Sequence, residues 1–335
     1  MEDENLLENE ESGNELYVGS EKSLRPTGFE EYIGQPRAIK QLKVHVGAVK
    51  ARQAKGEEEV LEHVMFEGQA GLGKTSLAFV VANELGSKLR VMQAKSLEKA
   101  GDLVANISCL EHGDVLFLDE IHSLDPSVAE ILYSVMEDFR LDITADGRVL
   151  NIPLPHFTLV GATTDFGKLK KPLQERFTHK VTLLRYTDSE LIEIIERSAP
   201  ILGYEIERDA AELIAKRAKG TPRTANSILK IARNYAELNG GVITVPVTKE
   251  ALEDADISKD GLRTNDVRYL TCLFESGKPV GLTTLSGMTG IDVKTIETTV
   301  EPYLLENGFI EKLPRGRCLT KKGVEYVESL QSGVE

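Results

Sequence analysis

The apolar residues in the first half of this chain fall into short continuous runs. The runs cover residues 64–66, 91–92 and 115–118, and a largely apolar segment at 157–164 ends in two threonines. Runs of this length without alternation predict strands that are buried on both faces of a sheet. Longer segments between or before them carry apolar residues at helical spacing, at 38–48, 76–85 and 97–110. Strands that alternate with helices predict an α/β fold with a parallel sheet.

The second half changes to helices alone. Thr187 with Glu190 forms the pattern of a capping box before a helix over 188–199. Further helices are predicted at 208–218 and 224–238, with another beginning at Thr248. After a polar linker at 256–261, three short helices and a basic turn predict a winged helix-turn-helix; they lie at 266–274, 284–289, 293–306 and 315–320.

Charge divides the chain further. The first 21 residues contain many Glu and no Lys or Arg, which predicts a disordered acidic tail. The predicted domains are therefore the tail at 1–21, a large α/β domain at 22–184, a small helical domain at 185–256 and a winged-helix domain at 257–330. The net charge of −14 argues against nucleic-acid binding over the whole surface but leaves room for a local basic patch.

Composition excludes several classes of protein. The chain of 335 residues has ordinary apolar and charged content, no apolar run of membrane-spanning length and no signal peptide, so we expect a cytoplasmic protein without a membrane partner. Its three cysteines, Cys109, Cys272 and Cys318, show no paired spacing. They indicate neither a disulfide framework nor a zinc site.

The most informative motif is Gly-Gln-Ala-Gly-Leu-Gly-Lys-Thr at 68–75. It matches the phosphate-binding loop and stands between a predicted strand and a predicted helix, the context that such a loop requires. The glycines Gly68, Gly71 and Gly73 let backbone N–H groups surround phosphates. Lys74 is expected to reach the β- and γ-phosphates of ATP, and the Thr75 hydroxyl is expected to hold Mg²⁺.

A second motif follows 45 residues after this lysine. The predicted strand at 115–118 ends in Asp119 and Glu120. A parallel strand brings its carboxyl end to the edge of the sheet where ligands bind. Asp119 is expected to act on Mg²⁺, mostly through water, and Glu120 to orient or deprotonate the attacking water.

Residues 141–152 predict a β-hairpin. Two alternating arms flank Asp146-Gly147, a strong signal for a two-residue turn. Its Leu, Ile and Val side chains are either covered by the body of the domain or exposed as a patch for a partner. The sequence leaves both possibilities open, and core packing is the more common.

The ordered set of segments from Leu24 to Leu319 resembles the bacterial RuvB family, AAA+ motors that drive branch migration of Holliday junctions in recombination and DNA repair. The matching segments lie at 24–26, 31–35, 97–103, 119–122, 136–143, 161–164, 220–223 and 314–317. The resemblance implies an AAA+ P-loop core, a small all-helical lid and a C-terminal winged helix. It also implies ATP and Mg²⁺ as cofactors.

The resemblance assigns roles to matching positions. Tyr32, Ile33 and Tyr186 would line the adenine pocket. Thr164 corresponds to the sensor that positions water or the γ-phosphate, Arg223 to the second sensor, and Arg176 to an arginine finger that acts on a neighbouring subunit's site. The remaining positions implied to bind ATP are Leu24, Arg25, Leu72 and Ser76.

The same resemblance implies partners. A finger that acts in trans implies a homo-hexameric ring. Arg315 and Arg317 would meet the backbone of duplex or four-way DNA without reading sequence. A RuvA-type junction-binding protein is the expected partner at the hairpin, and a RuvC-type resolvase is a further one that the family allows.

The chain departs from the family pattern at several points. Gln69-Ala70 replaces two prolines in the loop, Asp165 replaces an arginine, and Thr178 replaces a glycine. The hairpin is shorter than usual, so binding to a standard RuvA needs its own test.

Two other functions compete with the motor. A clamp-loader or helicase-loader type switch would use ATP to assemble other proteins on DNA, and the winged helix argues against it. A non-catalytic, nucleotide-gated binding module would not need Glu120, Thr164 and Arg176.

Overall fold

The computed structural model describes residues 24–145 and 148–332, and the side chains of 143–150 are not described. The acidic tail and the Asp146-Gly147 turn predicted from the sequence lie outside the described residues. The chain divides into two compact units, one of residues 1–203 with Thr221–Arg223 and one of Tyr204–Gly220 with Thr224–Glu335. Each is described by itself.

A five-stranded sheet forms the centre of the first unit, in the order β2-β3-β6-β1-β7. All its pairings are parallel; Val64 of β1, for example, pairs with Val160 of β6 and His179 of β7. The strands are β1 (Val64–Glu67), β2 (Leu89–Gln93), β3 (Val115–Asp119), β6 (Thr158–Thr163) and β7 (His179–Thr182). The predicted α/β class and the parallel sheet are thereby confirmed.

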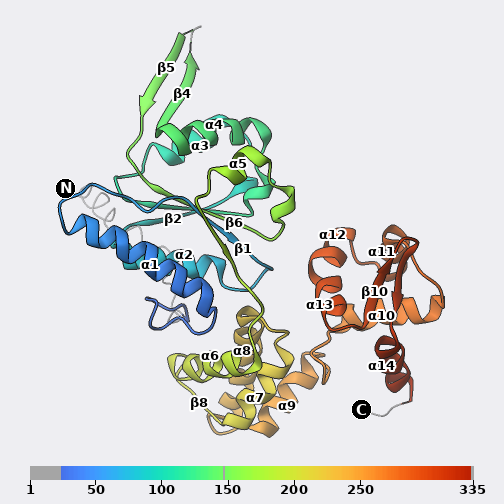
Figure 1. Cartoon of the computed structure of the whole chain (residues 1–335). Helices are drawn as coiled ribbons and strands as arrows, with labels where there is room; N and C mark the ends of the chain where they lie inside the picture. The colour runs from blue at the N-terminus through green and yellow to red at the C-terminus, as the bar shows by residue number, and fades with distance from the viewer. Residues whose placement is uncertain (1–23, 146–147, 333–335) are drawn as a thin grey trace, which may run out of the picture. The chain divides into compact units, whose positions relative to one another are not determined.

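Helices cover both faces of this sheet. On one face lie α1 (Pro36–Gln53) and α2 (Lys74–Leu85); on the other lie α3 (Ala100–Ile107), α4 (Pro126–Asp138) and α5 (Lys171–Glu175) (Figure 1). Met65, Leu116 and Leu159 point toward α3 to α5 and pack there with Leu132 and Val135. Because successive side chains of a strand point to opposite faces, Phe66 and Phe117 are buried on the side of α1 and α2.

The helix predicted over 97–110 is shorter in the structure. Asp102 accepts the Lys99 N–H at 2.9 Å, so α3 begins only after Lys99. It ends at Ile107. Before it, residues Ala94–Ser96 form a 3₁₀ turn.

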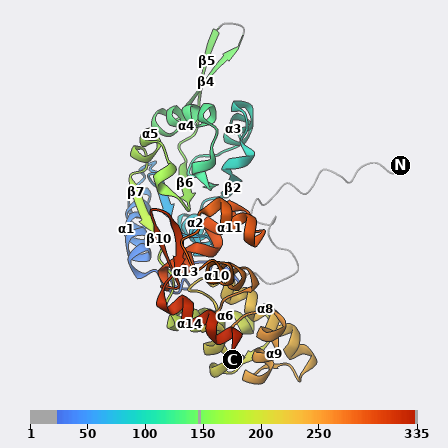
Figure 2. The same ribbon diagram turned by 90° about the vertical axis from the view of Figure 1, so that its right-hand side faces the viewer.

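The predicted hairpin is present. Strands β4 (Arg140–Ala145) and β5 (Arg148–Pro153) pair antiparallel, with Ala145 opposite Arg148. The hairpin projects beyond α4 in both views (Figures 1 and 2). Among the described side chains of the hairpin and its ends, those of Leu141 and Leu154 at the base are packed into the core.

Helix α6 (Asp188–Ile201) has the capping box expected from the sequence: Thr187 accepts the Glu190 N–H and the Glu190 carboxylate accepts the Thr187 N–H. It clusters with the first unit. The second unit begins with α7 (Arg208–Arg217), α8 (Pro222–Leu238, whose first two residues cluster with the first unit) and α9 (Val245–Asp254). It also has a short parallel pair of β8 (Glu205–Ile206) and β9 (Val242–Ile243).

The predicted start of α9 at Thr248 is wrong. Thr244 is the N-cap, its hydroxyl accepts the Val247 N–H, and Thr248 is buried inside the helix. Pro246 in the first turn explains the difference, because proline has no N–H to lose there.

The rest of the second unit is the predicted winged helix. Its elements are α10 (Thr264–Ser276), α11 (Leu282–Thr289), α12 (Val293–Thr295), a π-helical turn (Ile296–Val300), α13 (Glu301–Glu306), β10 (Ile310–Leu313), β11 (Gly316–Leu319) and α14 (Lys321–Gln331). Their shared core includes Tyr269, Leu285, Ile296, Leu304 and Phe309. Among the described residues, no helix is long and apolar enough to cross a membrane.

Candidate active site

The phosphate-binding loop joins β1 to α2, as predicted. Gly68, Gly71 and Gly73 all have positive φ, and a side chain at Gly68 would come within 2.9 Å of the Leu183 carbonyl. Glycine is therefore required by the backbone path. The loop leads directly into the N-terminus of α2, where free N–H groups and the helix dipole favour the binding of an anion.

Lys74, the first residue of α2, is folded back over this loop. Its ammonium donates to the carbonyl oxygens of Gly68 at 2.7 Å and Gln69 at 3.1 Å. Burial lowers the pKa of Lys74, while Glu120 and Asp119 act in the opposite direction. Two backbone carbonyls thus hold the cation at the place where the predicted phosphates would lie.

Two tyrosines meet against the same loop. The Tyr186 hydroxyl lies 3.3 Å from the Tyr32 hydroxyl and 3.4 Å from the Leu72 carbonyl, and Tyr32 is 3.5 Å from the Gly73 carbonyl. Burial raises the pKa of both phenols, so both stay protonated as donors. The structure brings together two residues that the resemblance placed in one adenine pocket, with half-buried Ile33 next to Tyr32 in the chain.

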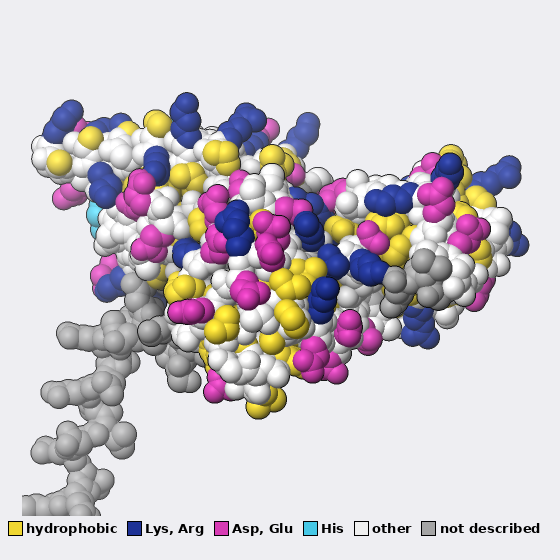
Figure 3. All heavy atoms as spheres, turned by 90° about the horizontal axis from the view of Figure 1, so that it is seen from below, with side chains coloured by type: hydrophobic (Ala, Val, Ile, Leu, Met, Phe, Trp, Pro, Cys, Tyr) yellow, Lys and Arg dark blue, Asp and Glu magenta, His cyan; other side chains and the backbone are white. Residues whose placement is uncertain are grey.

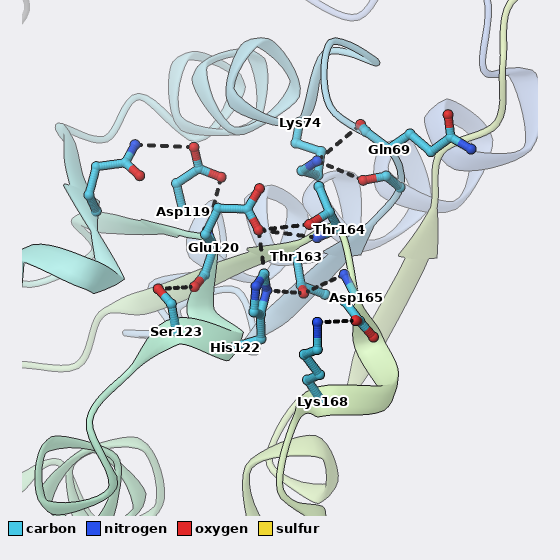
Figure 4. A network of polar contacts seen from close by, with 12 residues as sticks. Gln69, Lys74, Asp119, Glu120, His122, Ser123, Thr163, Thr164, Asp165 and Lys168 are labelled. Carbon is cyan, nitrogen blue, oxygen red and sulfur yellow. Dashed lines mark hydrogen bonds and ion pairs between the residues drawn. The ribbon is translucent and has the colours of Figure 1, made fainter. Parts of the chain in front are cut away.

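The two carboxylates that end β3 take different partners (Figure 4). Asp119 accepts hydrogen bonds from Gln93 Nε2 at 3.1 Å and from the Glu120 N–H at 3.0 Å. Glu120 has a φ of 50° and accepts from the Thr164 hydroxyl at 3.0 Å. Thr164 follows β6, the neighbour of β3, so the sheet itself joins the predicted general base to the predicted sensor.

His122 adds a contact that sequence reasoning missed. Its Nδ1 lies 3.2 Å from Glu120 Oε2 and 2.9 Å from the hydroxyl of buried Thr163 (Figure 4). Thr163 also accepts the Asp165 N–H at 3.0 Å, and Asp165 pairs with Lys168 at 2.9 Å. The hydrogen bond from Lys168 lowers the pKa of Asp165. The position of His122, two residues after Glu120, was the only available signal.

Arg223 approaches the loop by its backbone. Its N–H lies 3.4 Å from the Gly71 carbonyl, and a Cβ on Gly71 would come within 3.2 Å of the Arg223 Cβ. Leu24 is tied to α6, because Arg197 donates to its carbonyl oxygen. Thr75 and Ser76 occupy the first turn of α2.

Two glutamines hold the segment just before Tyr186 in place. Gln35 donates its amide to the Leu184 carbonyl at 2.6 Å and accepts the Leu184 N–H at 3.0 Å. Gln69, which stands where the family has proline, accepts from Arg185 at 2.5 Å. Both contacts fix the segment that carries Tyr186, and neither follows from a sequence motif.

Arg176 lies away from this cluster, directly after α5. Within the described part of the chain it makes no hydrogen bond or ion pair with the loop, Asp119 or Glu120. Its guanidinium instead contacts α4 and α5. A role of Arg176 in a neighbouring subunit's site stays a prediction.

The two arginines of the wing differ. Arg315 is exposed in the turn between β10 and β11, whereas Arg317 donates to the buried Glu301 carboxylate at 2.7 Å. DNA contact by Arg315 stays a prediction; Arg317 has a structural partner that the sequence did not reveal. On the face shown in Figure 3, Lys and Arg are interspersed with Asp and Glu, so no broad basic surface is seen there.

Comparison with known proteins covers nearly the whole chain. Residues 24–183 match the model of the Holliday junction DNA helicase RuvB P-loop domain, 186–258 the RuvB AAA lid domain, and 259–328 the RuvB C-terminal winged helix domain. Curated relatives include the Holliday junction branch migration complex subunit RuvB of Chloroflexus aggregans, 44% identical over 92% of this chain and 88% of that protein. The protein of the same name from Lactobacillus helveticus is 44% identical over 96% of this chain and 93% of that one.

Solved structures agree. The Thermotoga maritima RuvB Holliday junction branch migration motor superposes with a TM-score of 0.82 at 40% identity, covering 91% of this chain and 98% of that chain. A point mutant of Thermotoga maritima RuvB gives 0.83 at 41% identity with the same coverage. Three matched domains in order, together with this identity over most of the length, lead to one conclusion: the chain belongs to the RuvB family.

Proposed function

We propose that this protein is an ATP-driven motor that promotes branch migration of Holliday junctions in recombination and DNA repair. The observation that carries the proposal is the Glu120–Thr164 contact at the carboxyl edge of the sheet, beside a complete phosphate-binding loop, in a chain of the RuvB family. A general base held by a sensor residue next to a P-loop suits hydrolysis, which a purely structural nucleotide site would not need.

The residues present suit ATP and Mg²⁺. Hard oxygen donors are what Mg²⁺ prefers, and the Thr75 hydroxyl and the Asp119 carboxylate would hold it, where it would neutralise phosphate charge. Lys74 binds the phosphates in place of the two carbonyls that hold it here. Glu120 orients the attacking water and accepts its proton, and Thr164 fixes the direction of the Glu120 carboxylate.

The site is completed by a second subunit. Arg176 contacts its own α4 and α5, so its action on a phosphate requires a neighbouring copy. A guanidinium supplied in trans stabilises the charge that develops during phosphoryl transfer. This assignment implies a ring, which we propose to be the hexamer, with Arg223 reaching the phosphates from the lid side.

DNA and protein partners are assigned to different domains of the chain. Arg315 in the wing would contact the phosphate backbone without reading sequence. The β4–β5 hairpin, which projects beyond α4, would bind a RuvA-type junction-binding protein.

The deciding experiment is branch migration of a synthetic four-way junction with ATP, with and without a RuvA-type partner. We expect strand exchange by the wild type and none by Glu120→Gln, which should still bind ATP. DNA-stimulated ATP hydrolysis without any branch migration, in both conditions, would instead support a loader-type switch and contradict the motor.

A further inference from the structure

The guanidinium of Arg176 is held by three acceptors of its own chain. Nε donates to the Tyr133 carbonyl at 3.2 Å, Nη1 to the Pro172 carbonyl at 2.8 Å, and Nη2 to Glu137 Oε2 at 2.5 Å. The guanidinium also lies over the Tyr133 ring, 5.0 Å from its centre. The finger is therefore not a free side chain waiting for a neighbour.

Of these acceptors only Glu137 carries a charge. A guanidinium has five N–H donors, and the two that have no acceptor in these contacts belong to Nη1 and Nη2. The carbonyls orient the side chain without changing its charge. Glu137 compensates the positive charge on which stabilisation of a phosphoryl group depends. It therefore competes directly with a phosphate for Arg176.

The competition is reversible because the pair is accessible. The Glu137 side chain is 63% exposed and that of Arg176 is 26% exposed. Ion pairs open to water are weak and exchange readily. A triphosphate from a neighbouring subunit, with more charge and more acceptor oxygens, can replace Glu137 once it is brought close.

Glu137 also lies next to the base of the hairpin, through the chain and through a backbone hydrogen bond. It is the second-last residue of α4, and after Phe139, which has a φ of 48°, the chain enters β4 at Arg140. Leu154 at the end of the hairpin donates its N–H to the Phe139 carbonyl at 2.7 Å. Both arms of the hairpin thus converge on the residue next to the end of α4.

We propose that Glu137 restrains the arginine finger: it neutralises Arg176 in the resting subunit, and a partner bound to the β4–β5 hairpin displaces the end of α4 and releases it. Glu137 is a positioning residue, since it acts through Arg176. The inference rests on the proposed function, in which Arg176 acts in trans. It makes the hairpin a regulator of hydrolysis and not only a docking site.

The test compares Glu137→Gln with Glu130→Gln. Both residues are exposed on α4, but among the described contacts Glu130 forms neither a hydrogen bond nor an ion pair. The glutamine at 137 keeps an acceptor and removes the charge. With DNA present and no partner protein, we expect Glu137→Gln to raise kcat for ATP several-fold at unchanged KM, and the stimulation by a RuvA-type protein to shrink by a similar factor. Glu130→Gln should match the wild type.

Two other results would overturn the proposal. If Glu137 instead orients the finger productively, kcat of Glu137→Gln falls with and without the partner, and the proposal is overturned. Unchanged kcat and unchanged stimulation overturn it as well. Sedimentation and circular dichroism establish that both variants fold and assemble like the wild type.

Arg176→Ala separates this inference from the proposed function. Full ATPase activity in Arg176→Ala would remove the finger assignment itself. An inactive Arg176→Ala with an unaltered Glu137→Gln would remove only the restraint. The double variant should be as inactive as Arg176→Ala; any activation by Glu137→Gln in that background would show that Glu137 does not act through Arg176.

Discussion

Arg317 Nε lies 2.7 Å from Glu301 Oε1, and the Glu301 side chain has no exposed surface. Tyr269 donates to the same carboxylate at 2.9 Å and Lys312 pairs with it at 2.6 Å. The backbone of Arg317 is held too, by two hydrogen bonds with Val280. The wing is thus attached to the helices through a buried charge, and a residue expected to contact DNA forms the attachment.

Substitution should distinguish a structural role of Arg317 from an exposed role of Arg315 in the wing, the β10–β11 hairpin. Arg317→Ala leaves a buried carboxylate with fewer partners, and we expect it to lower the free energy of unfolding of the winged helix by about 3 kcal/mol. Arg315→Ala, on an exposed turn, should change it by less than about 0.5 kcal/mol. Calorimetry of the full chain measures both. Equal stability of the two variants would show that the Glu301 contact contributes little.

The DNA affinity of Arg315→Ala gives the complementary result. Loss of one phosphate contact should weaken binding to all duplex sequences alike and reduce the salt dependence of binding by about one unit of slope. Titration of a labelled duplex at several salt concentrations measures this slope. An unchanged slope would contradict a phosphate contact by Arg315.

Acid should destabilise the winged helix through Glu301. Burial acts to raise the pKa of Glu301, but hydrogen bonds from Arg317, Lys312 and Tyr269 outweigh it and leave the pKa below its ordinary value. The stabilisation is therefore complete above the pKa of the unfolded state and is lost as pH falls toward the lower pKa of the folded state. Hydrogen exchange of α13 between about pH 6 and pH 3, the range given by ordinary glutamate titration, should show this loss. Glu301→Gln should be less stable than the wild type at the upper end of this range and depend less on pH.

Thr164→Val should reduce hydrolysis without reducing binding of ATP. The valine keeps the shape of threonine but cannot donate to Glu120, so the general base loses its orientation. A base displaced by about 1 Å can cost about 100-fold in kcat. Steady-state kinetics should show lower kcat at similar KM. Ser123→Ala is the matched control, because among the described residues the Ser123 hydroxyl donates to the Glu120 backbone carbonyl, at 2.8 Å, and not to its carboxylate.

Mixed rings should reveal action in trans. Lys74→Ala removes the cation held at the phosphate-binding loop and should abolish nucleotide binding, while Arg176→Ala should bind ATP but not hydrolyse it. Each subunit type supplies what the other lacks, so mixing two inactive variants should restore part of the ATPase activity. No recovery in rings shown to contain both types would argue that Arg176 acts within its own subunit.

Gly34→Ala should disturb the tyrosine pair. Gly34 has a φ of 78°, and a Cβ there would come within 2.6 Å of the Tyr186 ring. Backbone strain alone costs roughly 1–3 kcal/mol at such a position. We expect lower thermal stability and weaker nucleotide binding. Gly47→Ala in α1, where a Cβ meets nothing within 4 Å, should instead raise stability by roughly 0.5–1 kcal/mol.

Much of the fold follows from local pattern. The continuous apolar runs at 64–66 and 115–118 became central strands, and Thr187 with Glu190 marked the start of α6. These signals work because each element must satisfy its own backbone and bury its own apolar side. The same local signals led to a wrong helix start at Thr248. In the structure the helix starts earlier, after the N-cap Thr244, with Pro246 in its first turn.

What the sequence by itself determined is the chemistry available: a glycine loop with the phosphate-binding pattern, two carboxylates at the end of a strand, and an arginine after α5. Only the tertiary structure decided which groups meet. Glu120 contacts Thr164, 44 residues away, because β3 and β6 are neighbours. Arg176 meets Glu137 because α4 and α5 pack together, and Arg317 meets Glu301 because the wing folds back on α13. The spacing of apolar residues and the positions of glycines reflect constraints on the local backbone. The partner of a charged side chain depends instead on how elements distant in the sequence pack together.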